Sequence, residues 1–484
     1  MKVTVVFDDT GKKSEVISDI IGDKGFADVV VKKRRLEEYY RDELKKEYPE
    51  LNWQKLHSLF EFADLSEELE YRVSGDMRIL HCFSDFLISD PESARLTFRK
   101  LNYVDKPYAV FSEKKAVAAM FPSVQSYLSF CREITAGKKP RELVREFKDS
   151  CEIEGLVDIG KIGNFIQCVT GNFDSRYFNS LKGNEYTIVK SSANKDKIRA
   201  EYKFYHLLPE DMKYWFVMPF DHKETADEAS YTMERLHMTD LAIKWVHGSM
   251  DEAEFEELMD KYFYFFSCRH EKKCSKEEYK NISDALYVKK VKDRIAALKA
   301  HKDYKKIESL LAATGSDSID TLAERYFALK EKIEKKCSYP LKLVIGHGDP
   351  CFANALYNKS TKTLKFIDPR GALSEEELWT DPYYDVAKLS HSVCGSYDFF
   401  NNALFDIHIN ESFSAELEIP FDNTVYVEIF KKRLEQSGFD WLSVRLYEAS
   451  LFLSMLPLHM DNPLKVLGFI LNVKKLLEEI EKDV

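Results

Sequence analysis

The sequence LVIGHGDPCFANALY, from Leu343 to Tyr357, is followed closely by LKFIDPRG, from Leu364 to Gly371. Each segment opens with an apolar run that is typical of a short buried strand, and each run ends in polar residues. Asp349 follows the first strand, Asn354 lies five residues later, and Asp368 lies fourteen residues after Asn354. A short polar turn should join the two strands as a hairpin, so we expect these three side chains to lie close together.

Two carboxylates and one carboxamide in this arrangement suit phosphoryl transfer. Asp349 is predicted to accept or orient the proton of a hydroxyl, while Asn354 and Asp368 are predicted to hold Mg²⁺ against nucleotide phosphates. The alternative is a pair of buried strands with capping aspartates. Three matched polar elements in one order argue against that alternative.

The segment HGDPCFAN, residues 347–354, resembles the catalytic loop of the aminoglycoside phosphotransferase and choline kinase superfamily, in which H-x-D, four residues and asparagine follow in order. IDPRG, residues 367–371, resembles the metal-binding segment of these kinases, and DPYYDVAKLSHS, residues 381–392, resembles the helix after it. The resemblance implies an α+β, bilobal, protein-kinase-like domain. It also implies ATP and Mg²⁺ as cofactors and a small-molecule hydroxyl as the acceptor.

Residues 161–238 are predicted to form the smaller lobe of that domain. Tyr186–Val189 is expected to be a strand that delivers Lys190, and the helix predicted over residues 195–208 carries Glu201. Kinases use such a pair to neutralise the nucleotide phosphates, with the glutamate holding the lysine in place. The alternative is a surface lysine beside a solvated helix face.

The turn before this strand lacks the glycine-rich phosphate loop of protein kinases. Phe165–Val169 is expected to be the strand that enters the turn, and Ser175 and Asn179 are candidate phosphate-binding residues within it. Met233 falls where the link between the lobes is expected. Backbone groups there are predicted to bind the nucleotide base, and a plain core position for Met233 is the alternative.

Residues 239–484 are predicted to form the larger, largely helical lobe. The strongly charged helices between residues 240 and 341 are expected to hold the acceptor, as the resemblance implies. Asp385 is predicted to hydrogen-bond the catalytic loop and fix it. The mostly apolar stretch from Leu446 to Leu458 is expected to close the core of this lobe.

Residues 1–135 alternate strand and helix patterns, which predicts an α/β domain with a mostly parallel sheet. The order of these elements resembles the nucleotidyltransferase fold of sugar-nucleotide pyrophosphorylases, in which an aspartate, here Asp85, binds metal. The glycine-rich nucleotide loop of that family is absent, because the first strand is followed by FDDTGKKSE. A single glycine cannot form the phosphate cradle, so we predict a degenerate, non-catalytic relative. Residues 136–160 are predicted to be a linker.

The whole chain of 484 residues has a net charge of −11 and no basic block, which disfavours nucleic acid as a main partner. No apolar run approaches the length of a membrane span, and the N-terminus predicts a first strand, not a signal peptide. Nine cysteines without paired spacing are expected to be free thiols. These properties predict a cytoplasmic protein.

Further wording, such as SRYFNSL and EYTIVKSS, resembles phosphotransferase-like proteins found with bacterial capsule and surface-polysaccharide genes. We therefore predict an ATP- and Mg²⁺-dependent kinase that phosphorylates a hydroxyl of a sugar or amino alcohol in surface-polysaccharide precursor metabolism. The alternatives are a bifunctional kinase and nucleotidyltransferase, and a nucleotide-binding pseudokinase that binds a partner. The sequence does not specify the acceptor, ATP against GTP, the role of the N-terminal domain or the oligomeric state.

Overall fold

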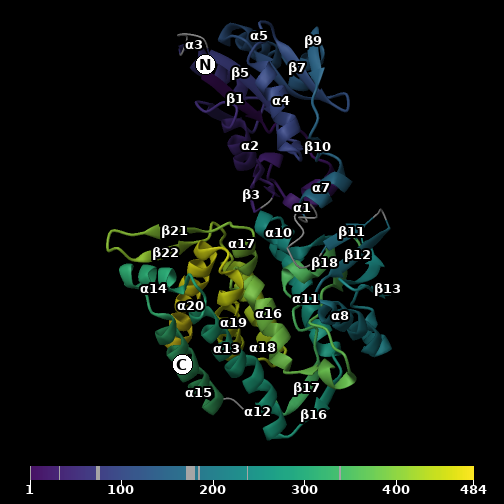
Figure 1. The fold of residues 1–484 in the computed structure, drawn as a ribbon, viewed down its shortest axis with the longest axis vertical. Helices are drawn as coiled ribbons and strands as arrows, with labels where there is room; N and C mark the ends of the chain where they lie inside the picture. The colour runs from purple at the N-terminus through teal and green to yellow at the C-terminus, as the bar shows by residue number, and fades with distance from the viewer. Residues whose placement is uncertain are drawn as a thin grey trace. The chain divides into compact units, whose positions relative to one another are not determined.

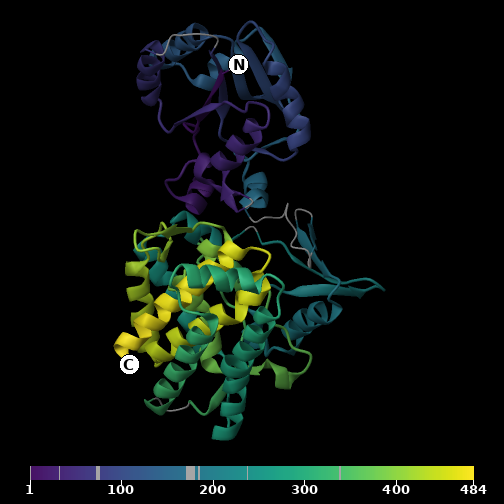
Figure 2. The same cartoon turned by 60° about the vertical axis from the view of Figure 1, so that its left-hand side comes forward.

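The computed structural model describes residues 2–31, 33–71, 77–169, 180–183, 186–236, 238–336 and 340–484. The chain divides into two compact units, unit 1 (Met1–Asp174) and unit 2 (Ser175–Val484). Figure 1 labels the helices and strands of both units, and Figure 2 shows the same ribbon turned by 60°.

Unit 1 is built on a six-stranded sheet with the order β4-β1-β5-β8-β7-β9. Its strands are β1 (Lys2–Asp8), β4 (Asn52–Leu56), β5 (Met77–Phe83), β7 (Tyr108–Ser112), β8 (Lys115–Phe121) and β9 (Asp149–Glu152). The sheet is mostly parallel, as predicted, because β1 is parallel to β4 and β5 and β7 is parallel to β9. β8 is the exception and runs antiparallel to both β5 and β7. Glu113 and Lys114 both have positive φ, which is the backbone of a two-residue hairpin turn and forces β7 and β8 to be antiparallel.

Helices and short strands complete unit 1. They are α1 (Glu15–Ile21), η1 (Phe26–Asp28), β2 (Val30–Val31), β3 (Arg34–Arg35), α2 (Leu36–Lys45), α3 (Glu61–Tyr71), β6 (Phe86–Ile88), α4 (Pro91–Leu101), α5 (Val124–Thr135), α6 (Pro140–Arg145), β10 (Leu156–Asp158) and α7 (Ile162–Val169). α5 begins at Ser123, whose side chain accepts a hydrogen bond from Ser126 N. Its apolar face, with Tyr127 and Ile134, packs with Phe62 of α3 in one buried cluster.

The structure corrects the prediction for residues 136–169. The supposed linker contributes β9, which pairs with β7, and β10, which pairs with β6. Phe165–Val169, predicted as a strand, lies in helix α7, where Phe165 and Cys168 are buried at a spacing of three residues. The Phe165 ring lies 6.4 Å from that of Phe26. The predicted boundary at residue 135 and the start of the smaller lobe at residue 161 therefore fall inside unit 1.

Asp85 of unit 1 is enclosed by basic side chains. Arg141 Nη1 and Nη2 donate to its two carboxylate oxygens at 2.9 and 2.6 Å. Lys115 Nζ lies 2.8 Å from Asp85 Oδ2 and 2.7 Å from Asp158 Oδ1. Burial alone would raise the pKa of Asp85, but Arg141 and Lys115 lower it. In this structure the charge of Asp85 is therefore neutralised by side chains that connect β8, α6 and β10.

Unit 2 contains a four-stranded antiparallel sheet with the order β11-β12-β14-β13. The strands are β11 (Ser180–Gly183), β12 (Thr187–Ser192), β13 (Pro219–Glu224) and β14 (Ala229–Glu234), and α8 (Lys195–Leu207) and α9 (Glu210–Lys213) accompany them. α8 begins at Asn194, whose side chain accepts a hydrogen bond from Lys197 N. Ile198 of α8 packs against Tyr231 and Met233 of β14.

The larger part of unit 2 is mostly helical. Its elements are β15 (Thr239–Asp240), α10 (Leu241–His247), α11 (Glu252–Cys268), β16 (Glu271–Lys273), α12 (Lys276–Asp284), η2 (Ala285–Lys289), α13 (Lys290–Lys299), α14 (Tyr304–Ala313), α15 (Ile319–Lys336), β17 (Lys342–Ile345), η3 (Phe352–Asn354), β18 (Ala355–Asn358), β19 (Thr363–Phe366), η4 (Glu375–Leu378), β20 (Trp379–Thr380), α16 (Pro382–Val393), α17 (Tyr397–Asn401), β21 (Asp406–Ile409), β22 (Ala415–Glu418), α18 (Thr424–Gln436), α19 (Trp441–Met455), η5 (Leu456–His459) and α20 (Pro463–Asp483).

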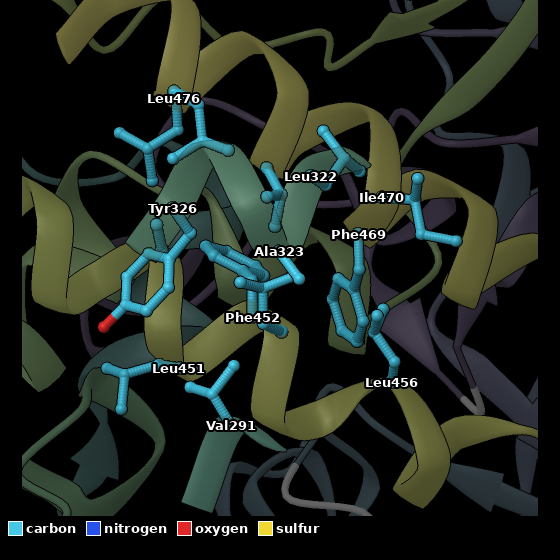
Figure 3. Packing of buried hydrophobic residues seen from close by; sticks show 14 of the residues in the cluster. Val291, Leu322, Ala323, Tyr326, Leu451, Phe452, Leu456, Phe469, Ile470 and Leu476 are labelled. Carbon is cyan, nitrogen blue, oxygen red and sulfur yellow. The ribbon is translucent and has the colours of Figure 1, made fainter. Parts of the chain in front are cut away.

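Helix α19 lies at the centre of this part, as its apolar sequence predicts. Every residue from Ser443 to Ser454 is buried, which is typical of a helix packed on all sides. Figure 3 shows Phe452 of α19 among Val291 of α13, Tyr326 of α15 and Phe469 of α20.

In the described part of the chain, no helix is both long and apolar enough to cross a bilayer, and the described cysteines form no disulfide.

Four carboxyl groups of unit 2, three buried and one partly buried, hold their protons at unusually high pH. Burial raises the pKa of Asp381 to about 6. It raises the pKa values of the other three to about 7; these are Asp240, Asp398 and Glu448. The unfolded chain, whose carboxyl pKa values are about 4, releases these protons at lower pH. Folding is therefore favoured when they are protonated, and stability is lost as the pH rises through the folded-state values.

Burial lowers the pKa values of His347 and His391, which opposes this trend because folding favours their neutral forms. Since four carboxyl groups outweigh two histidines, we expect the melting temperature to fall as the pH rises from about 5 to about 7.5. Melts recorded by circular dichroism across this range test the expectation. Asp398→Asn should make the dependence shallower, because it removes one of the four titrating groups. Asp196→Asn, at a side chain that is 84% exposed, is the control and should leave the slope unchanged. An Asp398→Asn variant with the wild-type slope would contradict this account.

Candidate active site

Three of the predicted residues meet at one point of unit 2. Lys190 Nζ, from β12, lies 2.7 Å from Glu201 Oε2 of α8 and 2.7 Å from Asp368 Oδ1, which follows β19. The side chains of Lys190 and Glu201 are 2% and 3% exposed, whereas that of Asp368 is 37% exposed. The strand lysine and the helical glutamate are thus paired in the structure. Their roles in binding a nucleotide stay predictions.

The positive charge of Lys190 is stabilised by its neighbours. Burial alone would lower the pKa of Lys190, but Asp368 and Glu201 raise it, so the ammonium stays charged at neutral pH. Tyr231 donates a hydrogen bond from its hydroxyl to Glu201 Oε2 at 3.1 Å. Lys197 Nζ lies 3.6 Å from the other oxygen of Glu201, so two ammonium groups face two carboxylates here. The exposed carboxylate of that set is Asp368, which is therefore the group that can contact a further cation.

The segment that carries Asp368 has an uncommon backbone. Asp368 has a φ of 56°, in the left-handed region that non-glycine residues rarely adopt. Neighbouring hydrogen bonds hold it there, from Ile367 N to Asn354 O at 3.0 Å and from Arg370 N to His347 O at 2.9 Å. Such strain costs about 1–3 kcal/mol and is found mainly at functional sites.

Gly371 lets the same segment approach helix α8. Its φ is 90°, and a Cβ there would lie 2.8–2.9 Å from atoms of Ala200. Ala372 N donates to Ala200 O at 3.1 Å. Because Ala200 precedes Glu201, this contact fixes Asp368 relative to the helix that positions Lys190.

Asp385 of α16 fixes the loop that contains Asp349, as predicted. Its carboxylate accepts hydrogen bonds from His347 N at 2.9 Å and Gly348 N at 2.7 Å. Arg269 Nη1 lies 3.3 Å from Asp385 Oδ2, and the two side chains are 1% and 0% exposed. The His347 ring extends the network, because its Nε2 lies 2.9 Å from Ile367 O. The loop and the Asp368 segment are therefore held as one body. The sequence analysis did not identify Arg269.

Asp349 lies beside a lysine that the sequence analysis also missed. Lys388 Nζ is 2.9 Å from Asp349 Oδ1, and the two side chains are 13% and 38% exposed. Desolvation acts to raise the pKa of Asp349, but Lys388 outweighs it and the pKa is lowered, so Asp349 is ionised at neutral pH. Lys388 lies three residues after Asp385 on α16. Residues at that spacing share a helix face. Because Asp385 was predicted to contact the loop, the same spacing predicts that Lys388 lies near the loop as well.

Asn354 is bound to the same loop. Its Nδ2 donates to Asp349 O at 2.9 Å, so its Oδ1 is the atom left to bind a cation. The hairpin of β18 and β19, with Ala355 opposite Phe366, brings Asn354 near the segment of Asp368, and Asn354 O accepts from Ile367 N. The predicted hairpin therefore exists. The metal-binding roles of Asn354 and Asp368 stay predictions.

Ser175, Asn179 and Met233 are the remaining predicted site residues. Ser175 and Asn179 lie outside the described residues, so their predicted phosphate contacts stay predictions. Met233 is 8% exposed and lines a cavity of about 20 Å³ with Glu201 and Tyr231. Its strand β14 is paired on both sides, with β12 and β13. The predicted role of this segment in binding a nucleotide base stays a prediction.

Comparison with known proteins gave matches only among solved structures. No family model and no curated protein matches the chain. Aminoglycoside phosphotransferase APH(4)-Ia is 12% identical, with 66% of this chain and 97% of that chain covered and a TM-score of 0.35. For the streptomycin–ATP–APH(2")-IIa ternary complex the identity is 15%, the coverages are 63% and 89%, and the TM-score is 0.34.

A thermostable APH(4)-Ia mutant in complex with AMP-PNP and hygromycin B is 11% identical, with coverages of 63% and 91% and a TM-score of 0.35. The chain is thus structurally similar to aminoglycoside phosphotransferases over about 63% of its length.

Proposed function

We propose that unit 2 is an ATP- and Mg²⁺-dependent phosphotransferase that transfers the γ-phosphoryl group of ATP to a hydroxyl of a sugar or amino alcohol. The observation that carries this proposal is the position of Lys190, which is held by Glu201 and contacts Asp368, each at 2.7 Å. A buried ammonium fixed by one carboxylate and directed at a second, exposed carboxylate can neutralise nucleotide phosphates next to a metal ion.

The residues of the site fit Mg²⁺, which prefers oxygen ligands and keeps several waters. Asp368 offers an exposed carboxylate and Asn354 offers its amide oxygen, and both are fixed by the hydrogen bonds of the loop. When bound, Mg²⁺ neutralises charge on the nucleotide phosphates. The protein then acts mainly by positioning the nucleotide and the acceptor. Lys190 binds phosphate oxygens, and Asp349, ionised at neutral pH, accepts or orients the hydroxyl proton of the acceptor.

Positive charge beside Asp349 narrows the class of acceptor. Lys388 contacts Asp349 directly, and Lys290 Nζ donates to Tyr384 OH at 2.8 Å. Lys388 and Lys290 both act to lower the pKa of Asp349, so the positive charge of each lysine stabilises the Asp349 carboxylate. A neutral or acidic sugar suits this potential better than a polycation. Together with the sequence resemblance described above, this supports a role in surface-polysaccharide precursor metabolism.

Asp368→Asn should remove the effect of Mg²⁺ on nucleotide binding, because it exchanges a charged metal ligand for a neutral one. We expect wild type to bind AMP-PNP more tightly with Mg²⁺ than with EDTA. Loss of an outer-shell partner alone weakens metal sites about 10–100-fold, and loss of this ligand should cost at least as much. Calorimetric titrations with and without Mg²⁺, for adenine and guanine nucleotides, measure this.

Asp196→Asn on α8 is the matched control for that titration, because its side chain is 84% exposed. It should bind nucleotide as wild type does. If Asp368→Asn, still folded, keeps the full effect of Mg²⁺, the metal is held elsewhere and the assignment of Asp368 is wrong.

A further inference from the structure

The carboxyl ends of two strands in unit 1 carry possible metal ligands that the proposed function does not use. β1 and β4 are parallel neighbours with Asp8 opposite Leu56, so the next residues, Asp9 and His57, leave the sheet side by side. Asp28 joins them from η1. Within the described ranges, these three form the one group of His, Cys, Asp or Glu whose ligand atoms all lie within 4.8 Å of one another.

Asp9 has a buried oxygen without a partner. Its side chain is 1% exposed. Oδ1 accepts hydrogen bonds from Ser84 Oγ at 2.6 Å and from Ala27 N at 3.1 Å. Oδ2 is buried and has no hydrogen-bond partner in the described part of the chain, and His57 Nδ1 lies 4.0 Å away from it. A buried, unpaired carboxylate oxygen is costly, and a bound cation would remove that cost.

Gly25 lets the Asp9 carboxylate lie directly against the backbone. A Cβ at Gly25 would lie 1.8 Å from Asp9 Oδ2. The backbone of Gly25 has φ −78° and ψ 175°, a conformation that any residue adopts. Since its backbone conformation does not require glycine, the close approach of the Asp9 carboxylate is what excludes a side chain at this position.

We propose that Asp9, Asp28 and His57 bind a divalent transition-metal ion such as Mn²⁺ or Zn²⁺. Two carboxylates and one imidazole suit these ions, whereas Mg²⁺ prefers oxygen ligands alone. Three protein ligands leave open positions for water or a further ligand. The proposal is independent of the phosphotransferase site, because all three residues belong to unit 1.

Asp28 can take part without leaving a lysine unpaired. Its Oδ1 lies 3.1 Å from Lys55 Nζ, and the other carboxylate oxygen can face the ion. Lys55 Nζ also lies 2.9 Å from Glu37 Oε2, so it keeps an acidic partner if Asp28 turns toward the metal. His57 is 54% exposed at its side chain and is free to rotate its ring toward Asp9.

Titration of the nucleotide-free, full-length protein with Mn²⁺, followed by the electron paramagnetic resonance of the free ion, tests the proposal. Asp368→Asn serves as the parent, so that the predicted magnesium ligand of unit 2 does not contribute. We expect one Mn²⁺ to bind, Zn²⁺ to displace it, and equal Mg²⁺ to leave it in place. His57→Gln and Asp9→Asn should each weaken Mn²⁺ binding at least tenfold.

His408→Gln is the matched control, because His408 is an exposed histidine 3.0 Å from Glu418 in unit 2. It should bind Mn²⁺ as the parent does. His57→Gln keeps the test decisive if Asp9→Asn unfolds, since His57 is largely exposed. A parent that binds no Mn²⁺, or a folded His57→Gln variant with the affinity of the parent, would overturn the proposal.

Discussion

Asp349→Asn should lower the turnover of phosphoryl transfer by about 10²–10⁴-fold, the usual contribution of a general base. The substitution keeps the shape of the side chain and removes the negative charge that Lys388 holds at 2.9 Å. Nucleotide affinity should change little, because the nucleotide is assigned to Lys190 and Asp368. Initial rates with an identified acceptor, together with calorimetric binding of AMP-PNP, measure the two quantities separately.

The Asp349→Asn variant should also keep its stability. Its ion pair is partly exposed, with 38% of the Asp349 side chain accessible, and such pairs contribute about 0–1 kcal/mol. A lowered rate with an unchanged melting temperature would therefore report on chemistry and not on folding. Equal turnover by the variant and wild type would remove Asp349 from the mechanism.

Asp385→Ala should lower the free energy of unfolding by about 3–5 kcal/mol, as expected when one partner of a buried ion pair is removed. It would leave Arg269, 1% exposed, without its carboxylate. The backbone N–H groups of His347 and Gly348 would lose their acceptor as well. Urea unfolding followed by circular dichroism measures the change, and activity should fall with it because the loop of Asp349 loses its anchor.

Asp260→Ala is the matched control for Asp385→Ala. Asp260 pairs with Arg433 at 2.7 Å, but the two side chains are 58% and 27% exposed. We expect a loss of less than about 1 kcal/mol there. If Asp385→Ala lost no more than this control, the buried network would not be what holds the loop. Arg269→Leu offers a second route to the same question should Asp385→Ala fail to fold.

Several contacts of the candidate site could be predicted because the spacing of the residues along the chain fixes them. Asp349, Asn354 and Asp368 lie on or next to one hairpin, and Lys190 and Glu201 lie on a strand and the helix after it, so short loops bring together the members of each set. The contact between Lys190 and Asp368 joins the two sets over 178 residues, and local spacing does not give it. Contacts that depend on distant packing were missed. Lys388 and Arg269 reach the loop from helices whose positions the hydrophobic pattern does not specify.

Unit 1 was predicted less well, for two physical reasons. Glu113 and Lys114 adopt positive φ although neither is a usual residue for such a turn, so the hairpin and the antiparallel β8 went unrecognised. The short apolar run at Phe165–Val169 fits a strand or a buried helix equally well. In the structure the run is helical, and Phe165 packs against Phe26. The grouping of Asp9 with His57 likewise requires the register of β1 and β4, which composition does not give.

Transfer of labelled phosphate from [γ-³²P]ATP to a panel of sugars, sugar acids, amino alcohols and aminoglycosides tests the central claim most directly. We expect the full-length protein to label at least one sugar or amino alcohol, EDTA to abolish the transfer, and Asp349→Asn to reduce it by about 10²–10⁴-fold. Binding of ATP without Mg²⁺-dependent transfer to any acceptor would contradict it and would indicate a nucleotide-binding pseudokinase.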